Sequence, residues 1–242
     1  MPEQLLNLLY GALGGGLAAA AIRILETYWV APRLSESIEA GKKLRLYAKP
    51  LWLDCHELEF RLQAIRAKMQ GANFNKTASL KLSPGEAQSL AWFTKEGYYI
   101  TSTAYLIASV ASWIALFQRD VVFLQFSKKS LTSQFFDLIV RFKASISASP
   151  SILWYHYIDG IGENLIQEND NRPMSLAAFS HKMYSEPSFR DYYDQLFQFL
   201  HKVAEGQYNE QIDNTLMSLA EIKGFLERNG TVPEISEQKV DR

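Results

Sequence analysis

An uncharged run near the N-terminus constrains the chain more than any other feature. Residues 4–22, QLLNLLYGALGGGLAAAAI, contain no Asp, Glu, Lys or Arg, and the apolar stretch resumes after Arg23. A bilayer core about 30 Å thick is crossed by about 20 helical residues, so the run is just long enough. Tyr28 and Trp29 follow where interfacial aromatic residues are expected. The sequence therefore predicts one transmembrane helix over residues 4–25.

Two other interpretations of this run have less support. Ala18 to Ala21 would suit a signal-peptide cleavage site, but the residues ahead of the run include Glu3 and no Lys or Arg. A buried helix of a soluble domain would be weakened by the four glycines of residues 11–16, at about 1 kcal/mol each. In a membrane the same small residues allow helices to approach closely, which offsets that cost.

Basic residues near the predicted anchor lie only on its C-terminal side. They are Arg23, Arg33, Lys42, Lys43, Arg45 and Lys49. Because Lys and Arg concentrate in cytoplasmic flanks, we expect a single-pass protein with its C-terminal domain in the cytoplasm. The lone cysteine, Cys55, agrees with a reducing compartment.

Small residues recur at four-residue spacing within the predicted anchor. Gly11, Gly15 and Ala19 form one such series, and Gly16 and Ala20 form a second. This pattern is typical of membrane helices that pack against one another and predicts a homo-oligomer. The alternative is that glycine and alanine are simply common in membrane spans.

Most of the remaining chain has the three- and four-residue apolar spacing of amphipathic helices. A capping pattern at Ser83–Glu86 predicts a helix that runs to about Phe126, with a weak point at Gly97. No segment alternates with a period of two, so a sheet is not expected. The other predicted helices cover residues 51–69, 131–146, 151–166, 188–206 and 209–230.

These elements predict an all-α fold, a helical bundle domain on one N-terminal transmembrane helix. We expect an anchor with its interfacial end over 1–31, a polar connecting helix over 32–50 and a cytoplasmic helical bundle over 51–230. A frayed polar tail is expected over 231–242. Pro50 suits the first turn of a helix and is expected to begin a new one.

A second uncharged stretch, residues 98–117, is also long enough to cross a membrane. Its hydroxyl side chains Ser102, Ser109 and Ser112 fall on one helical face, and two charged residues lie immediately before it. A helix that is apolar almost all round is a central core helix when amphipathic helices are available to cover it. We therefore expect residues 98–117 to form the core of the bundle.

The sequence has no familiar catalytic motif. It lacks a phosphate-binding loop, a nucleophile elbow, a zinc-protease motif and paired Cys-x-x-Cys motifs. The best candidate site is His156, Asp159 and Glu163, at i, i+3 and i+7 on one helical face, where they could supply metal ligands or an acid–base pair. The alternatives are a solvated stripe or a buried polar network.

A second polar cluster comprises Asp54, His56, Glu57 and Arg61, in which Glu57 and Arg61 are expected to form an i,i+4 ion pair. Cys55 falls in the apolar seam of its helix and is expected to be a small core residue. We expect no cofactor, and the net charge of −1 gives no indication of a nucleic-acid partner.

Three segments share a recognisable pattern: residues 46–65, residues 98–126 and the turn Ile161–Glu163. In these three segments the chain resembles a group of bacterial proteins of unassigned function. It departs from that group at Ser109–Ser112, where the group tends to carry aromatic residues. The resemblance implies a short N-terminal helix in an inner or internal bacterial membrane, a helical cytoplasmic domain and no particular activity. The matching positions are Tyr47, Lys49, Pro50, Leu58, Arg61, Tyr99, Ser102, Thr103, Tyr105, Trp113, Arg119, Asp120, Phe123 and Leu124.

The sequence therefore favours a membrane-tethered, non-enzymatic helical module that self-associates or docks a protein partner at the cytoplasmic face. One alternative is a pore-forming or membrane-perturbing effector that uses residues 98–117 as a second span. Another is a metal-dependent enzyme with its site at His156, Asp159 and Glu163.

Overall fold

The computed structural model describes residues 31–69, 80–82, 84–87, 89–121, 129–167 and 170–229. The predicted anchor over 4–25 lies outside the described residues, as do its small residues and the predicted tail over 231–242. Those small residues are Gly11, Gly15, Gly16, Ala19 and Ala20.

Helices dominate the described residues, which confirms the all-α prediction. The longest is α2, Ala31–Met69, and it is followed by a 3-10 turn, η3, Pro84–Glu86. The other helices are α3, Leu90–Thr94; α4, Tyr98–Val121; α5, Lys129–Ser147; α6, Tyr155–Leu165; α7, Leu176–Ser185; α8, Pro187–Ala204; and α9, Asn209–Arg228. Two short strands, β1 (Ile166–Gln167) and β2 (Arg172–Pro173), form an antiparallel pair.

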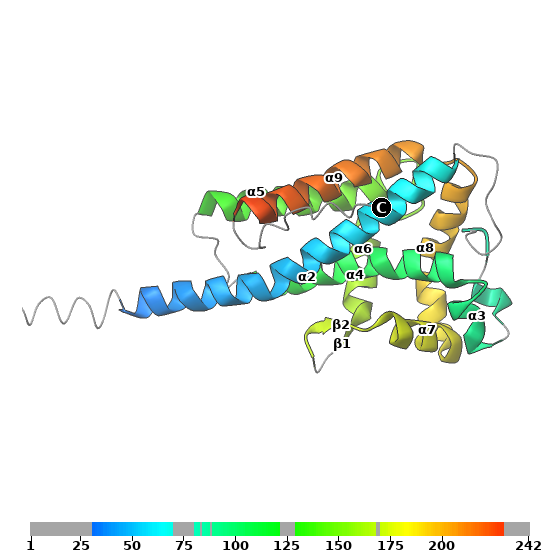
Figure 1. Cartoon of the computed structure of the whole chain (residues 1–242), viewed down its shortest axis with the longest axis horizontal. Helices are drawn as coiled ribbons and strands as arrows, with labels where there is room; N and C mark the ends of the chain where they lie inside the picture. The colour runs from blue at the N-terminus through cyan, green and yellow to red at the C-terminus, as the bar shows by residue number, and fades with distance from the viewer. Residues whose placement is uncertain are drawn as a thin grey trace, which may run out of the picture.

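The described helices pack around α4. Helix α2 crosses α4 on one side and α6 packs on another, while α9 lies between α2 and α5 (Figure 1). Helices α3, α7 and α8 close the end of the bundle near the start of α4. The N-terminal part of α2 extends beyond the other described helices, on the left of Figure 1.

Among the described residues, one helical segment is long and apolar enough to cross a membrane, and it is Tyr98–Arg119 of α4. Of its most apolar stretch, 83% is buried inside the bundle. Ile100, Ala104, Ala108 and Ile114 have no exposed surface. The structure therefore places residues 98–117 at the centre of the core, as predicted from the amphipathic helices around them.

The predicted start of a helix at Pro50 is wrong, because α2 continues through this residue. A proline inside a helix removes one backbone hydrogen bond. Here the residues on both sides are held by packing, since Ala48 and Leu51 are fully buried in the core. The boundary predicted between 32–50 and 51–230 is therefore not a break in the helix.

The predicted helix from Ser83 to Phe126 is divided in the structure. Helix α3 ends at Thr94, α4 begins at Tyr98, and the Gly97 backbone amide donates to the Trp92 carbonyl at 2.9 Å. A Cβ on Gly97 would lie 2.1 Å from the Trp92 ring, so only glycine fits this close turn. The division thus falls at Gly97, the weak point that the sequence predicts, where the Trp92 ring packs into the turn.

Two further differences concern the segment between α5 and α8. The helix predicted over 151–166 begins only at Tyr155, and α7 was not predicted at all. The Ser175 hydroxyl caps α7 by accepting a hydrogen bond from the Ala178 amide, so a capping residue did mark its start.

Candidate functional site

Helix α6 carries all three residues of the predicted site, and glycine sets its distance from α4. A Cβ on Gly162 would lie 2.6 Å from the backbone carbon of Ala111. The Ser112 hydroxyl donates to the Gly162 carbonyl at 2.8 Å and so fixes the two helices together. This contact holds α6 with Asp159 facing α5.

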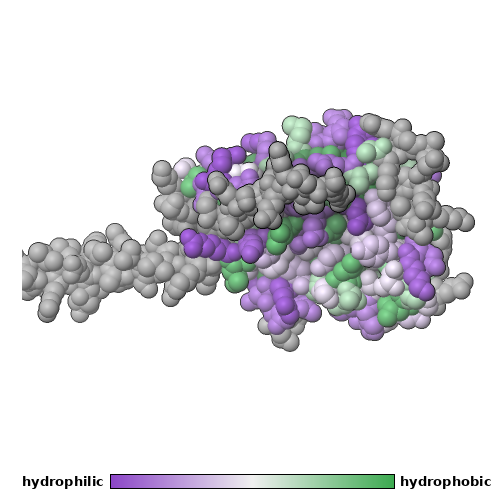
Figure 2. All heavy atoms as spheres, viewed as in Figure 1, coloured by the Kyte–Doolittle hydropathy of each residue, from purple (hydrophilic) through white to green (hydrophobic). Residues whose placement is uncertain are grey.

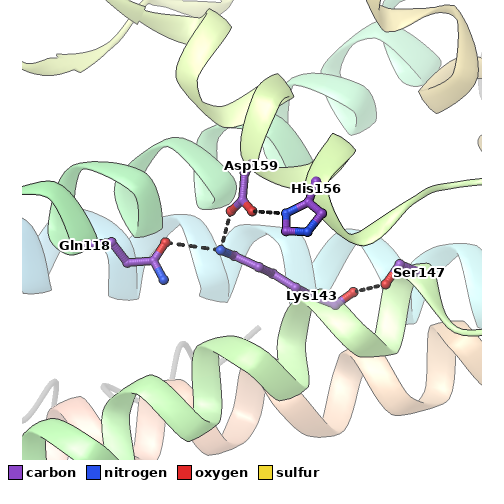
Figure 3. Close-up of polar contacts among 5 residues, drawn as sticks. All are labelled: Gln118, Lys143, Ser147, His156 and Asp159. Atoms are coloured by element: carbon purple, nitrogen blue, oxygen red, sulfur yellow. Dashed lines mark hydrogen bonds and ion pairs between the residues drawn. The ribbon is translucent and has the colours of Figure 1, made fainter.

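Asp159 forms an ion pair with Lys143 of α5, which the sequence analysis did not identify. The Lys143 side chain is only 3% exposed, and its Nζ donates to one Asp159 oxygen and, at 3.1 Å, to Gln118 Oε1 (Figure 3). The Lys143 amine also lies 5.6 Å from the centre of the Tyr155 ring. A buried ammonium requires such partners, because burial without them would cost several kcal/mol.

The structure brings His156 close to Asp159 but leaves Glu163 separate. His156 Nδ1 lies 3.7 Å from the second Asp159 oxygen, and the His156 side chain is 93% exposed (Figure 3). Glu163 is exposed and lines the same groove, which has a volume of about 880 Å³. Among the described residues, no group of three or more His, Cys, Asp or Glu side chains is placed to hold a metal ion. The three residues therefore do not form the metal site that their spacing allowed.

The chemistry of this groove follows from the Lys143–Asp159 pair. The Asp159 carboxylate neutralises the buried ammonium of Lys143 and so offsets the cost of burying that charge. His156 is solvated and has one weak acidic neighbour. Lys143, Gln118 and Asp159 thus form a polar network between α4, α5 and α6, with the exposed His156 at its edge.

A second groove of about 340 Å³ lies next to α2 and is lined by Asp54. One Asp54 oxygen accepts hydrogen bonds from the Ser109 hydroxyl and, at 2.8 Å, from the Trp113 indole. Burial raises the pKa of the Asp54 carboxyl, while the two hydrogen bonds oppose this effect and the charge of Glu57 adds to it. Asp54 thus connects α2 to α4 through a partly desolvated carboxylate.

The predicted Glu57–Arg61 ion pair is wrong. Among the described residues, no hydrogen bond or ion pair joins these two side chains, and Arg61 instead turns toward α4. Its guanidinium donates to the Tyr99 carbonyl at 3.2 Å and to the Ser102 hydroxyl at 2.9 Å, and it lies 4.4 Å above the Tyr99 ring. Packing of α2 on α4 brings these partners close, and the sequence of α2 alone could not indicate them.

Cys55 of α2 is fully buried, as expected of a core residue. Burial raises the pKa of its thiol, which disfavours the reactive thiolate. Its environment is that of a packing residue.

Comparisons with protein-family models, with curated proteins and with solved structures found no match to this chain. The resemblance to bacterial membrane-anchored helical proteins therefore stays a prediction.

Proposed function

We propose that this chain is a membrane-tethered, non-enzymatic helical module whose cytoplasmic domain self-associates and docks protein at the membrane surface. The observation that carries the docking role is a line of large apolar side chains exposed on α2. Leu46 is 64% exposed, Leu53 40% and Phe60 71%. A single exposed apolar residue is ordinary, and three on one side of the same helix support a contact surface there.

The contacts within the bundle give less support to the enzyme and to the pore than to the proposed function. Lys143 pairs with the carboxylate of Asp159, so one of the three residues on which the enzyme alternative rests is already engaged. The pore alternative would require α4 to leave its contacts with α2 and α6. It would also break the hydrogen bonds that Ser102, Ser109 and Ser112 make within the bundle.

The proposed tethering rests on the uncharged run over residues 4–22. Helix α2 would then determine how far the bundle lies from the membrane. Helix α2 is continuous for 39 residues from Ala31, which at about 1.5 Å per residue makes a rod nearly 60 Å long. A rod that begins a few residues after the anchor would hold the bundle near the bilayer and present its exposed face in a fixed direction.

Alkaline carbonate extraction of membranes that contain the full chain tests the tethering. We expect the wild-type protein to remain in the membrane pellet. A Leu13→Arg, Leu17→Arg variant should become soluble, because each arginine in a span costs about 2.5–3.5 kcal/mol on insertion scales. The matched control is Leu46→Arg, Leu53→Arg, which places the same charges on the exposed face of α2 and should remain in the pellet. Release of the wild-type protein by carbonate would contradict the tethering.

A further inference from the structure

Asp54 lines the groove of about 340 Å³ between α2, α4 and β2, and it has a free oxygen there. Both of its donors, the Ser109 hydroxyl and the Trp113 indole, bind the same carboxylate oxygen, Oδ2. Among the described residues, no hydrogen bond or ion pair reaches the other oxygen, Oδ1, and that atom is not fully buried. A partly buried carboxylate normally has a cationic partner or a full set of donors. Asp54 Oδ1 is therefore available to a ligand in the groove.

The walls of this groove suit a bound ammonium group. The Tyr105 and Trp113 side chains line it, and aromatic rings attract organic cations to their faces. The Tyr105 hydroxyl donates to the Met174 carbonyl at 3.0 Å and the Trp113 indole donates to Asp54, so both walls are held before a ligand enters. A divalent metal ion is a poor occupant, because it needs several oxygen ligands and Asp54 is the one carboxylate among the described residues that line this groove.

Two cationic side chains line the same groove and indicate that the ligand also carries a negative charge. Lys49 is exposed and forms no ion pair with the described residues. Arg172 of β2 pairs with Asp170 through Nε and Nη2, and its Nη1 has no partner in the described part of the chain. Neither cation contacts Asp54. Both would repel a ligand that is only positive, whereas both would attract a carboxylate, which arginine binds especially well.

From these contacts we infer that the groove binds a small zwitterion with the chemistry of a free amino acid. Its ammonium group pairs with Asp54 Oδ1 beside the Tyr105 and Trp113 rings, and its carboxylate pairs with Lys49 and Arg172. The groove lies near the lower end of the range for small-molecule sites, about 300–1,000 Å³, which suits a ligand of this size. The site is independent of the proposed tethering and self-association. Because the ligand contacts α2, α4 and β2 together, its binding stabilises the folded bundle.

Saturation-transfer NMR and thermal unfolding of the full chain test this site. The probes are glycine, β-alanine and γ-aminobutyrate, which present an ammonium and a carboxylate at increasing separation. Each probe is compared with its two halves, which for β-alanine are ethylamine and propionate. We expect at least one of the three amino acids to bind and to raise the unfolding temperature. Its two halves should each bind about tenfold more weakly or less, because each makes only one of the two charged contacts.

Two variants connect the binding to the groove. Asp54→Asn removes the charge that pairs with the ammonium, and Lys49→Gln removes a charge that pairs with the carboxylate. Both should weaken binding of the amino acid, Asp54→Asn by about tenfold or more. Lys49 is exposed, so Lys49→Gln tests the site even if Asp54→Asn does not fold. The matched control is Asp191→Asn, the same change at an exposed α8 residue that does not line the groove, and it should bind as the wild type does.

Three results would overturn the site. The first is no binding of any of the three amino acids to the wild-type chain. The second is an amine that binds as tightly as the amino acid from which it derives, since the carboxylate would then have no role. The third is unchanged binding in folded Asp54→Asn or in Lys49→Gln, which would place the ligand elsewhere on the molecule.

Discussion

At the scale of single residues, Asp54 holds a carboxyl group whose ionised form is disfavoured by burial. It is partly desolvated between α2 and α4, and it is held by two neutral donors, Ser109 and Trp113, rather than by a cation. Burial is the largest influence and raises the pKa of its carboxyl in the folded protein. The folded state therefore binds the Asp54 proton more tightly than the unfolded state does.

This raised pKa predicts a pH dependence with a definite sign. Between the unfolded pKa of about 3.9 and the raised folded value, the folded state holds more protons, so the free energy of unfolding falls as pH rises. Asp54→Asn keeps an oxygen acceptor for Ser109 and Trp113 but cannot ionise. Urea unfolding of both proteins at a series of pH values should give a difference in stability that moves in favour of Asp54→Asn as pH rises. A constant difference across this range would contradict the account.

Some residue roles were predictable from the sequence and others depended on folding. Cys55 lies in an apolar seam of its helix, and this position correctly predicted a core residue. The i,i+3 spacing of His156 and Asp159 correctly predicted that these two side chains lie close together. The partners Lys143 of Asp159 and Tyr99 of Arg61 come from other helices. Lys143 did offer one signal, because it lies one turn after the buried Ile139, at the core spacing of α5.

At the scale of elements, the α4–α6 contact depends on a missing side chain. Gly162→Ala would bring a methyl group to 2.6 Å from the backbone of Ala111, so the two helices must move apart. We expect a loss of about 1–3 kcal/mol or more in the free energy of unfolding, as for overpacked cores.

Gly224→Ala is the matched control, because its nearest neighbour is the flexible end of Arg228 at 3.0 Å. It should leave stability unchanged or raise it by up to about 1 kcal/mol through helix propensity. Thermal unfolding followed by circular dichroism measures both variants. Equal effects of the two substitutions would show that close α4–α6 packing does not need Gly162.

Helices with clear apolar spacing and end signals were predicted to within a few residues. Helix α8 begins at Pro187 and α9 ends at Arg228, two residues before Gly230. Helix ends that depend on tertiary packing were predicted only in part. The weak point predicted at Gly97 lies at the break between α3 and α4, where Trp92 packs against it. The continuation of α2 through Pro50 was not predicted, and it follows the burial of Ala48 and Leu51. Local propensity favours a break at Pro50, and burial of its neighbours overrides it.

At the scale of the whole molecule, the structure combines a self-contained bundle with one helix that extends beyond it. The bundle buries its most apolar helix, α4, and so requires no bilayer around that segment. Helix α2 alone leads back toward the predicted anchor and carries the exposed line of Leu46, Leu53 and Phe60. These exposed side chains are what supports the proposed self-association of the anchored chains. On the face shown in Figure 2, hydrophobic and hydrophilic residues are interspersed.

The most direct test is the mass of the full-length protein released from membranes in lipid nanodiscs. With a chain of 27.6 kDa, the account predicts two protein chains per particle for the wild type. It predicts one chain for Leu53→Lys, Phe60→Lys, and two for the control Val140→Lys, Met217→Lys. A wild-type particle with a single chain, or two chains in the Leu53→Lys, Phe60→Lys variant, would contradict it.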